Sequence, residues 1–123
     1  MPFLKLDEVD EKEFLPGSTV RSLHSAKMTF CHWHFKMDAL IPEHAHPHEQ
    51  VTHVIEGKLE LTVAGETQVL VPGSVAIVPS NAAHSGKAVT DCYCLDVFCP
   101  VREDYREGGS AEYLLRRRNS KEQ

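Results

Sequence analysis

The stretch 42–57, PEHAHPHEQVTHVIEG, concentrates side chains that bind metal ions. His44, His46 and Gln50 are separated by even numbers of residues. Because side chains alternate between the two faces of a β-strand, these three can converge on one point inside a barrel. Imidazole nitrogens are common ligands of divalent transition metals, and an amide oxygen can complete the set. Glu49, the nearer carboxylate, has the wrong parity unless a bulge intervenes.

A fourth ligand can come from His84, which follows the apolar run 75–78 and a loop of small polar residues. The four side chains then predict a site for one divalent metal ion. The alternative is that these histidines are polar lining of a barrel that holds no metal.

A second group of reactive side chains lies in the stretch LDVFCPVREDY. Asp96 and Phe98 share a parity, so both face the interior of a barrel if Asp96 does. A carboxylate is expensive to bury in an apolar interior unless it is paired or functional. Arg102 lies just beyond the strand, and we expect it at the rim, where its fork can hold a carboxylate. The alternative is a strand-end aspartate bonded to backbone beside an exposed arginine.

The elements that must position these residues are short strands separated by glycine and proline. The expected strands are 20–24, 28–36, 59–63, 67–71, 75–78 and 91–98. A tight hairpin is expected at Ala64-Gly65-Glu66, because glycine adopts positive φ readily. Many short strands without heptads or long repeats predict an all-β barrel.

The segment 28–36 alternates along its length as a strand does. One face carries Cys31, Trp33 and Phe35, and the other carries Phe30, His32, His34 and Lys36. One of these faces must meet the core. The sequence leaves open which face that is, and so whether His32 and His34 line the pocket or lie on the surface.

The chain has 123 residues and a formal net charge of −5, which suits a single domain. We expect an arm over 1–14, a barrel over 15–105 and a tail over 106–123. No basic stripe precedes the C-terminus, so nucleic acid is not an expected partner. The acidic first segment has no apolar run, so neither a signal peptide nor a membrane span is expected.

The four cysteines are Cys31, Cys92, Cys94 and Cys99, and they show no zinc-finger spacing. Cys92 and Cys94 point to the same side of one strand, which is poor geometry for a disulfide between them. Reduced thiols in a cytoplasmic protein are therefore expected.

The metal-binding stretch resembles the first metal motif of the cupin family, and PGSVAIVPSNAAH resembles the second. This resemblance implies a cupin double-stranded β-helix, that is, a jelly-roll barrel. It also implies that His44, His46, Gln50 and His84 hold one divalent ion, of the kind Ni, Fe, Mn or Zn. Cupins of this size commonly pair as homodimers, and the face that carries Trp33 offers apolar area for such a contact.

HPHEQ, VIEGKLELTV and the LDVF…RED ending together resemble the small cupins of pectin and alginate degradation. Those proteins convert unsaturated monouronates into linear ketonised sugars. The resemblance implies a metal-dependent isomerase or lyase that acts on a small anionic sugar. It places the proton-transfer carboxylate at Asp96, the aromatic wall at Phe98 and the carboxylate-binding arginine at Arg102. Two other classes stay open, a metal-dependent dioxygenase and a non-catalytic small-molecule sensor.

The last segment reads EGGSAEYLLRRRNSKEQ. Ser110 is a suitable N-cap for a short helix that carries Tyr113, Leu114 and Leu115. The alternative is a solvated tail.

Overall fold

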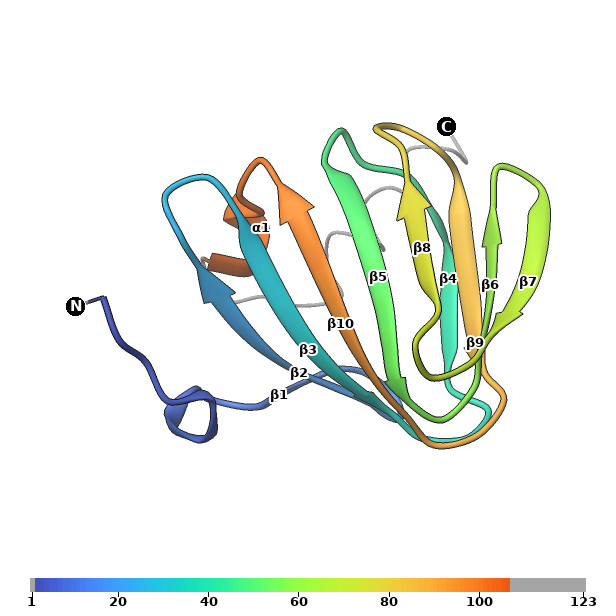
Figure 1. The fold of residues 1–123 in the computed structure, drawn as a ribbon, viewed down its shortest axis with the longest axis horizontal. Helices are drawn as coiled ribbons and strands as arrows, with labels where there is room; N and C mark the ends of the chain where they lie inside the picture. The colour runs from blue at the N-terminus through green and yellow to red at the C-terminus, as the bar shows by residue number, and fades with distance from the viewer. Residues whose placement is uncertain (1, 107–123) are drawn as a thin grey trace.

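The computed structural model describes residues 2–106, which form two antiparallel β-sheets packed face to face (Figure 1). The six-stranded sheet contains, in spatial order, β1 (Lys12–Leu15), β2 (Ser18–His24), β3 (Thr29–Phe35), β10 (Cys92–Cys99), β5 (Glu49–Glu56) and β8 (Val75–Val78). The four-stranded sheet contains β4 (Leu40–His44), β9 (His84–Ala88), β6 (Leu59–Val63) and β7 (Glu66–Leu70). The all-β jelly-roll fold expected from the sequence is confirmed.

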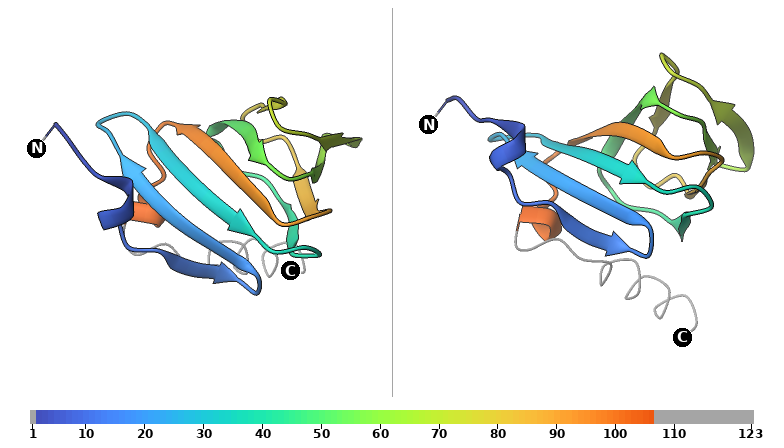
Figure 2. Two further views of the ribbon diagram at one scale, coloured as in Figure 1. Left: turned by 60° about the horizontal axis from the view of Figure 1, so that its bottom comes forward. Right: turned by 90° about the horizontal axis from the view of Figure 1, so that it is seen from below.

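Two short helical segments flank the sheets, the 3₁₀ helix η1 (Leu6–Glu8) and α1 (Glu103–Arg106). Figure 2 shows α1 beside β1 and β2, at one side of the six-stranded sheet. Across residues 2–106 we find no helix with the length and hydrophobicity that a transmembrane segment requires. The helix expected after Ser110 lies outside the described residues.

Strands with clean alternation match the expectation. In β10 every second side chain is buried, from Cys92 to Phe98. The hairpin between β6 and β7 turns through Ala64 and Gly65, whose φ angles are 48° and 83°. Positive φ at both central residues is the type I′ geometry that suits the twist of paired strands.

Two strands that the sequence pattern did not predict, β4 and β9, bring two of the histidines together. They pair in antiparallel register with His44 opposite His84. Gly86 allows β9 to lie between β4 and β6, because a Cβ there would approach the Ile41 Cδ1 atom to 3.2 Å and the Glu60 carbonyl oxygen to 3.3 Å. A side chain at this position would crowd both neighbouring strands.

The core lies between the sheets, and Cys31, Trp33 and Phe35 face into it. Their exposed fractions are 0%, 5% and 5%. This corrects the expectation that this face of β3 supplies apolar area for a dimer contact. His32 and His34 lie on the opposite face, where His32 Nδ1 is 2.6 Å from the Tyr93 hydroxyl and the His34 ring stacks on Tyr93. These two histidines therefore do not line the interior.

Phe14, in β1, belongs to the same core. Its ring packs edge-on against Trp33 and against Tyr105 in α1, with ring centroids 5.2 and 5.5 Å apart. The segment expected as an arm therefore ends in a strand that closes one side of the barrel.

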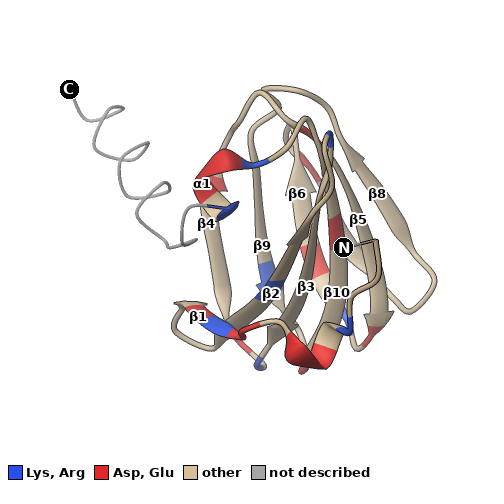
Figure 3. Cartoon of the chain, turned by 90° about the vertical axis from the view of Figure 1, so that its left-hand side faces the viewer, with Lys and Arg blue, Asp and Glu red and all other residues tan. Residues whose placement is uncertain are grey.

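Figure 3 shows basic positions scattered singly among acidic ones in this view of the described residues.

Candidate metal centre and the cavity beside it

Three buried histidines form a cluster inside the barrel. One ring nitrogen of each of His44, His46 and His84 lies within 4.8 Å of those of the other two. The rings of His44 and His84, a cross-strand pair, have centroids 4.1 Å apart. His46 joins them from the connection between β4 and β5. Such a group of imidazoles fits a divalent transition metal ion.

Backbone carbonyls set the tautomer of each ring. The Nδ1–H of His44 donates to the Pro42 carbonyl at 2.8 Å. The corresponding groups of His46 and His84 donate to the carbonyls of His48 and Ala82 at 3.0 and 2.9 Å. Because a carbonyl oxygen can only accept, each Nδ1 carries the proton and each Nε2 keeps a lone pair. This arrangement orients metal-binding histidines and fixes which nitrogen binds.

The environment keeps these imidazoles neutral. Burial, followed by the neighbouring His84, lowers the pKa of His44 to about 3. Burial and the nearby Arg102 charge lower the pKa of His46 to about 4. Burial also lowers the pKa of His84. Since a metal binds the neutral form of imidazole, the cluster is in its ligating state near neutral pH.

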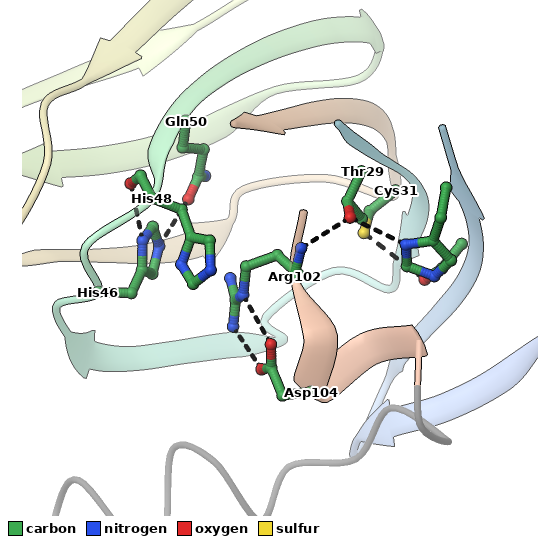
Figure 4. A network of polar contacts seen from close by, with 9 residues as sticks. Thr29, Cys31, His46, His48, Gln50, Arg102 and Asp104 are labelled. Atoms are coloured by element: carbon green, nitrogen blue, oxygen red, sulfur yellow. Dashed lines mark hydrogen bonds and ion pairs between the residues drawn. The ribbon is translucent and has the colours of Figure 1, made fainter. Parts of the chain in front are cut away.

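The glutamine oxygen faces the same cluster. Gln50 Oε1 lies 3.1 Å from His46 Nε2 (Figure 4). Both atoms are acceptors once Nδ1 holds the ring proton, so no proton lies between these neutral groups. His84 Nε2 is also buried without a hydrogen-bond partner among the described residues. A cation would satisfy all three atoms, and the residues therefore fit a divalent metal ion.

The candidate ligands converge, but they do not lie on one face of a single strand as their even spacing predicts. His44 ends β4 in the four-stranded sheet, whereas Gln50 lies in β5 of the six-stranded sheet. The chain crosses from one sheet to the other through residues 45–48, and His46 lies in this crossing. Convergence on one strand face was thus the wrong reason, because the side chains meet across the space between the sheets.

Asp96 lies beside this cluster, inside the barrel, where its parity with Phe98 placed it. The Thr52 hydroxyl donates to Asp96 Oδ1 at 2.7 Å. Burial raises the pKa of Asp96 to about 6, and the hydrogen bond from Thr52 opposes that rise. The Trp33 indole also favours the carboxylate, although its position falls short of hydrogen-bond geometry. A carboxyl group near this pKa can both accept and release a proton close to neutral pH.

Arg102 is buried, which corrects both its expected place at the rim and the alternative of an exposed arginine. Its side chain is 1% exposed. Its Nε and Nη2 donate to the two carboxylate oxygens of Asp104 at 3.0 and 2.8 Å (Figure 4). The ring centroids of Phe98 and Tyr105 lie 4.8 and 4.2 Å from the guanidinium carbon. The fork expected to hold a substrate carboxylate thus already holds one from the chain itself.

A cavity of about 50 Å³ opens among these groups. The predicted site residues that line it are His44, Gln50, His84, Asp96, Phe98 and Arg102. The centroids of the His46 and Phe98 rings are 5.6 Å apart. The structure therefore brings the two sequence-predicted groups, metal-binding and proton-transfer, into one site.

Three residues of this site were not predicted. Thr52 shares the parity of Gln50 on β5, so alternation alone could have indicated that it faces the interior. Asp104 and Tyr105 follow the last strand, where the sequence offers no period by which to place a side chain.

A sequence model of the cupin domain matches residues 31–98, more than half of the chain. The chain therefore belongs to the cupin family. It is also 28% identical over 74 residues to the pectin degradation protein KdgF of Dickeya dadantii (strain 3937), a match that covers 58% of this chain and 67% of that protein.

Solved structures show the same relationship. KdgF from Halomonas sp. superposes with a TM-score of 0.80 at 27% identity, covering 85% of this chain and 98% of that one. An RmlC-like cupin from Shewanella frigidimarina NCIMB 400 gives 0.81 at 27% identity, covering 85% and 96%. Bacillus subtilis oxalate decarboxylase shares the fold, with a TM-score of 0.70 at 18% identity over 79% of this chain and 28% of that one.

Proposed function

We propose that this chain is a metal-dependent cupin that converts unsaturated monouronates into linear ketonised sugars. The observation that carries the proposal is that one cavity is lined by Asp96, Arg102 and three of the four candidate metal ligands. The similarity to KdgF, a pectin degradation protein, supports a sugar of this class as the substrate.

Each residue has a part in such a reaction. A bound divalent ion supplies Lewis acidity, and neutral ligands leave its full charge to attract an anionic sugar. Asp96 accepts and returns a proton, for which its raised pKa suits it. Arg102 binds the uronate carboxylate through charge-assisted hydrogen bonds, and Phe98 forms the apolar wall beside it.

The cavity must enlarge before it can hold a sugar. Its volume of about 50 Å³ suits a few water molecules, whereas pockets for larger ligands span about 300–1,000 Å³. The element that has to move is the four-residue α1, because it carries Asp104, the present partner of Arg102, and Tyr105. In this proposal the substrate carboxylate takes the place of the Asp104 carboxylate on Arg102.

The direct test is the loss of ultraviolet absorbance of an unsaturated monouronate. We expect metal-loaded protein to remove the ultraviolet absorbance of at least one uronate in a small panel. Chelator-treated protein should lose this activity and recover it when Ni, Fe, Mn or Zn is added back. Oxygen uptake with an apolar organic substrate would instead identify a dioxygenase. Binding of uronate without turnover or oxygen uptake would identify a sensor.

Arg102→Ala is expected to raise the KM for the uronate about tenfold to a hundredfold with little change in kcat, because a hydrogen bond to a charged group contributes about 1.5–3 kcal/mol. It should also lower the free energy of unfolding by about 1–3 kcal/mol, since Asp104 loses its partner.

The double variant Arg102→Ala, Asp104→Ala separates these two effects. Removing the unpaired carboxylate should recover part of the stability, measured by urea unfolding, while the KM stays high. An unchanged KM in folded Arg102→Ala protein would contradict a role in substrate binding.

We also propose that the protein is a cytoplasmic homodimer. All four cysteines are free thiols in the described structure. The Trp33 face lies inside the core, so we assign the dimer contact to the outer face of β8 and β5. Val75, Ile77 and Ile55 are 52%, 65% and 42% exposed there. Light scattering at micromolar concentration should give twice the 13.8 kDa chain mass, and a value near one chain mass would contradict the dimer.

A further inference from the structure

A chain of hydrogen bonds joins the candidate ligand Gln50 to Asp96 through Thr52. Gln50 Nε2 donates to Thr52 Oγ1 at 2.9 Å, and Thr52 Oγ1 donates to Asp96 Oδ1 at 2.7 Å. Gln50 and Thr52 lie on the same face of β5, and Thr52 pairs directly with Asp96 across to β10. All three side chains are buried.

The direction of this chain fixes the orientation of the amide. Thr52 has a single hydroxyl proton, and that proton is directed at Asp96. Its oxygen can therefore only accept from Gln50, which requires the NH₂ group of the amide to face Thr52. The other end of the amide, the Oε1 atom, is then turned to His46 and the histidine cluster.

A glutamine ligand needs such an orienting contact more than a glutamate ligand does. A carboxylate presents an oxygen to a metal in either orientation about its terminal bond. An amide turned by 180° presents an NH₂ group, which has no lone pair for the metal and directs its protons at the cation. A hydrogen bond that holds the amide in one orientation therefore decides whether Gln50 can be a metal ligand.

We propose that Thr52 is a positioning residue that, anchored by Asp96, holds Gln50 with its oxygen toward the metal site. Thr52 is not itself a metal ligand in this proposal, because its hydroxyl is engaged by Gln50 and Asp96. The inference rests on the metal-binding part of the proposed function and is independent of which substrate is turned over.

Thr52→Val keeps the shape of the side chain and removes the hydroxyl. We expect it to weaken binding of Zn²⁺ and of Mn²⁺, each measured by competition with a chelating dye, about tenfold to a hundredfold, the usual effect of losing an outer partner of a metal ligand. Thr52→Ser, which keeps the hydroxyl, should bind within about threefold of wild type. Thr67→Val, the same substitution at an exposed position of β7, is the matched control and should leave affinity unchanged.

A second background separates orientation from packing. With Gln50→Glu, either carboxylate oxygen can face the metal, so adding Thr52→Val should change affinity by less than about threefold. An equal loss in both backgrounds would show that Thr52 acts through packing, and wild-type affinity in Thr52→Val would also overturn the proposal. Thr52→Ala carries the same expectation and replaces Thr52→Val if circular dichroism shows that the valine variant does not fold.

These outcomes stay distinct from those of the proposed function. Wild-type protein that binds neither metal overturns the metal site and the role of Thr52 together. Protein that binds metal with the expected dependence on Thr52, but turns over no uronate, overturns only the proposal that the substrate is an unsaturated monouronate.

Discussion

Replacing both His44 and His46 with alanine is expected to abolish stoichiometric metal binding. The two rings supply two of the three imidazoles in the cluster, and a lone histidine with an amide is a poor site for a divalent ion. The loss in affinity should exceed the roughly tenfold to hundredfold that follows removal of an outer partner. Elemental analysis of purified protein, normalised to the chain, measures the effect.

The chain offers a matched control in His32 and His34. These two histidines have the same spacing in sequence, but they lie on the outer face of β3 against Tyr93. His32→Ala, His34→Ala protein should therefore keep the metal content of wild type. Equal metal in wild type and in the His44, His46 double variant would contradict the site, provided that circular dichroism shows both proteins folded.

Periodicity in the sequence identifies the strands that have one face in the core and one outside. In β3 and β10 every second side chain is buried, and both were predicted. In β4 only His44 is buried, and the strand includes Pro42, which weakens any strand signal. β9 reads HSGKA and lacks apolar alternation. These two strands form through pairing with their neighbours, which no local pattern records.

The candidate metal ligands could be named from residue type, but their geometry could not. Imidazoles and an amide near one another in sequence indicate the chemistry, whereas their convergence depends on the crossing between sheets that carries His46. The jelly-roll topology came from the family resemblance, because alternation alone does not order strands in space. The buried position of Arg102 could not be predicted for a similar reason. Its partner Asp104 belongs to a helix of only four residues, which is too short to show a periodic pattern.

Asp96→Asn is expected to lower turnover of the uronate at least about a hundredfold, because general acid–base groups contribute roughly a hundredfold to ten-thousandfold. Asparagine keeps the shape and leaves an amide oxygen that can accept from Thr52, so the orientation of Gln50 and the metal content should persist. Turnover and bound metal, measured on the same preparation, should therefore separate.

The separation is what assigns Asp96 to proton transfer. A fall in both turnover and metal content would mean that Asp96 acts by supporting the metal site through Thr52 and Gln50. Asp38→Asn, at an exposed turn, is the control for the substitution itself. If Asp96→Asn protein turns over every uronate that wild type accepts at a near-normal rate, Asp96 serves only as an acceptor for the Thr52 hydroxyl. With His32 and His34 on the outer face, no histidine of β3 is then placed to replace it as the base.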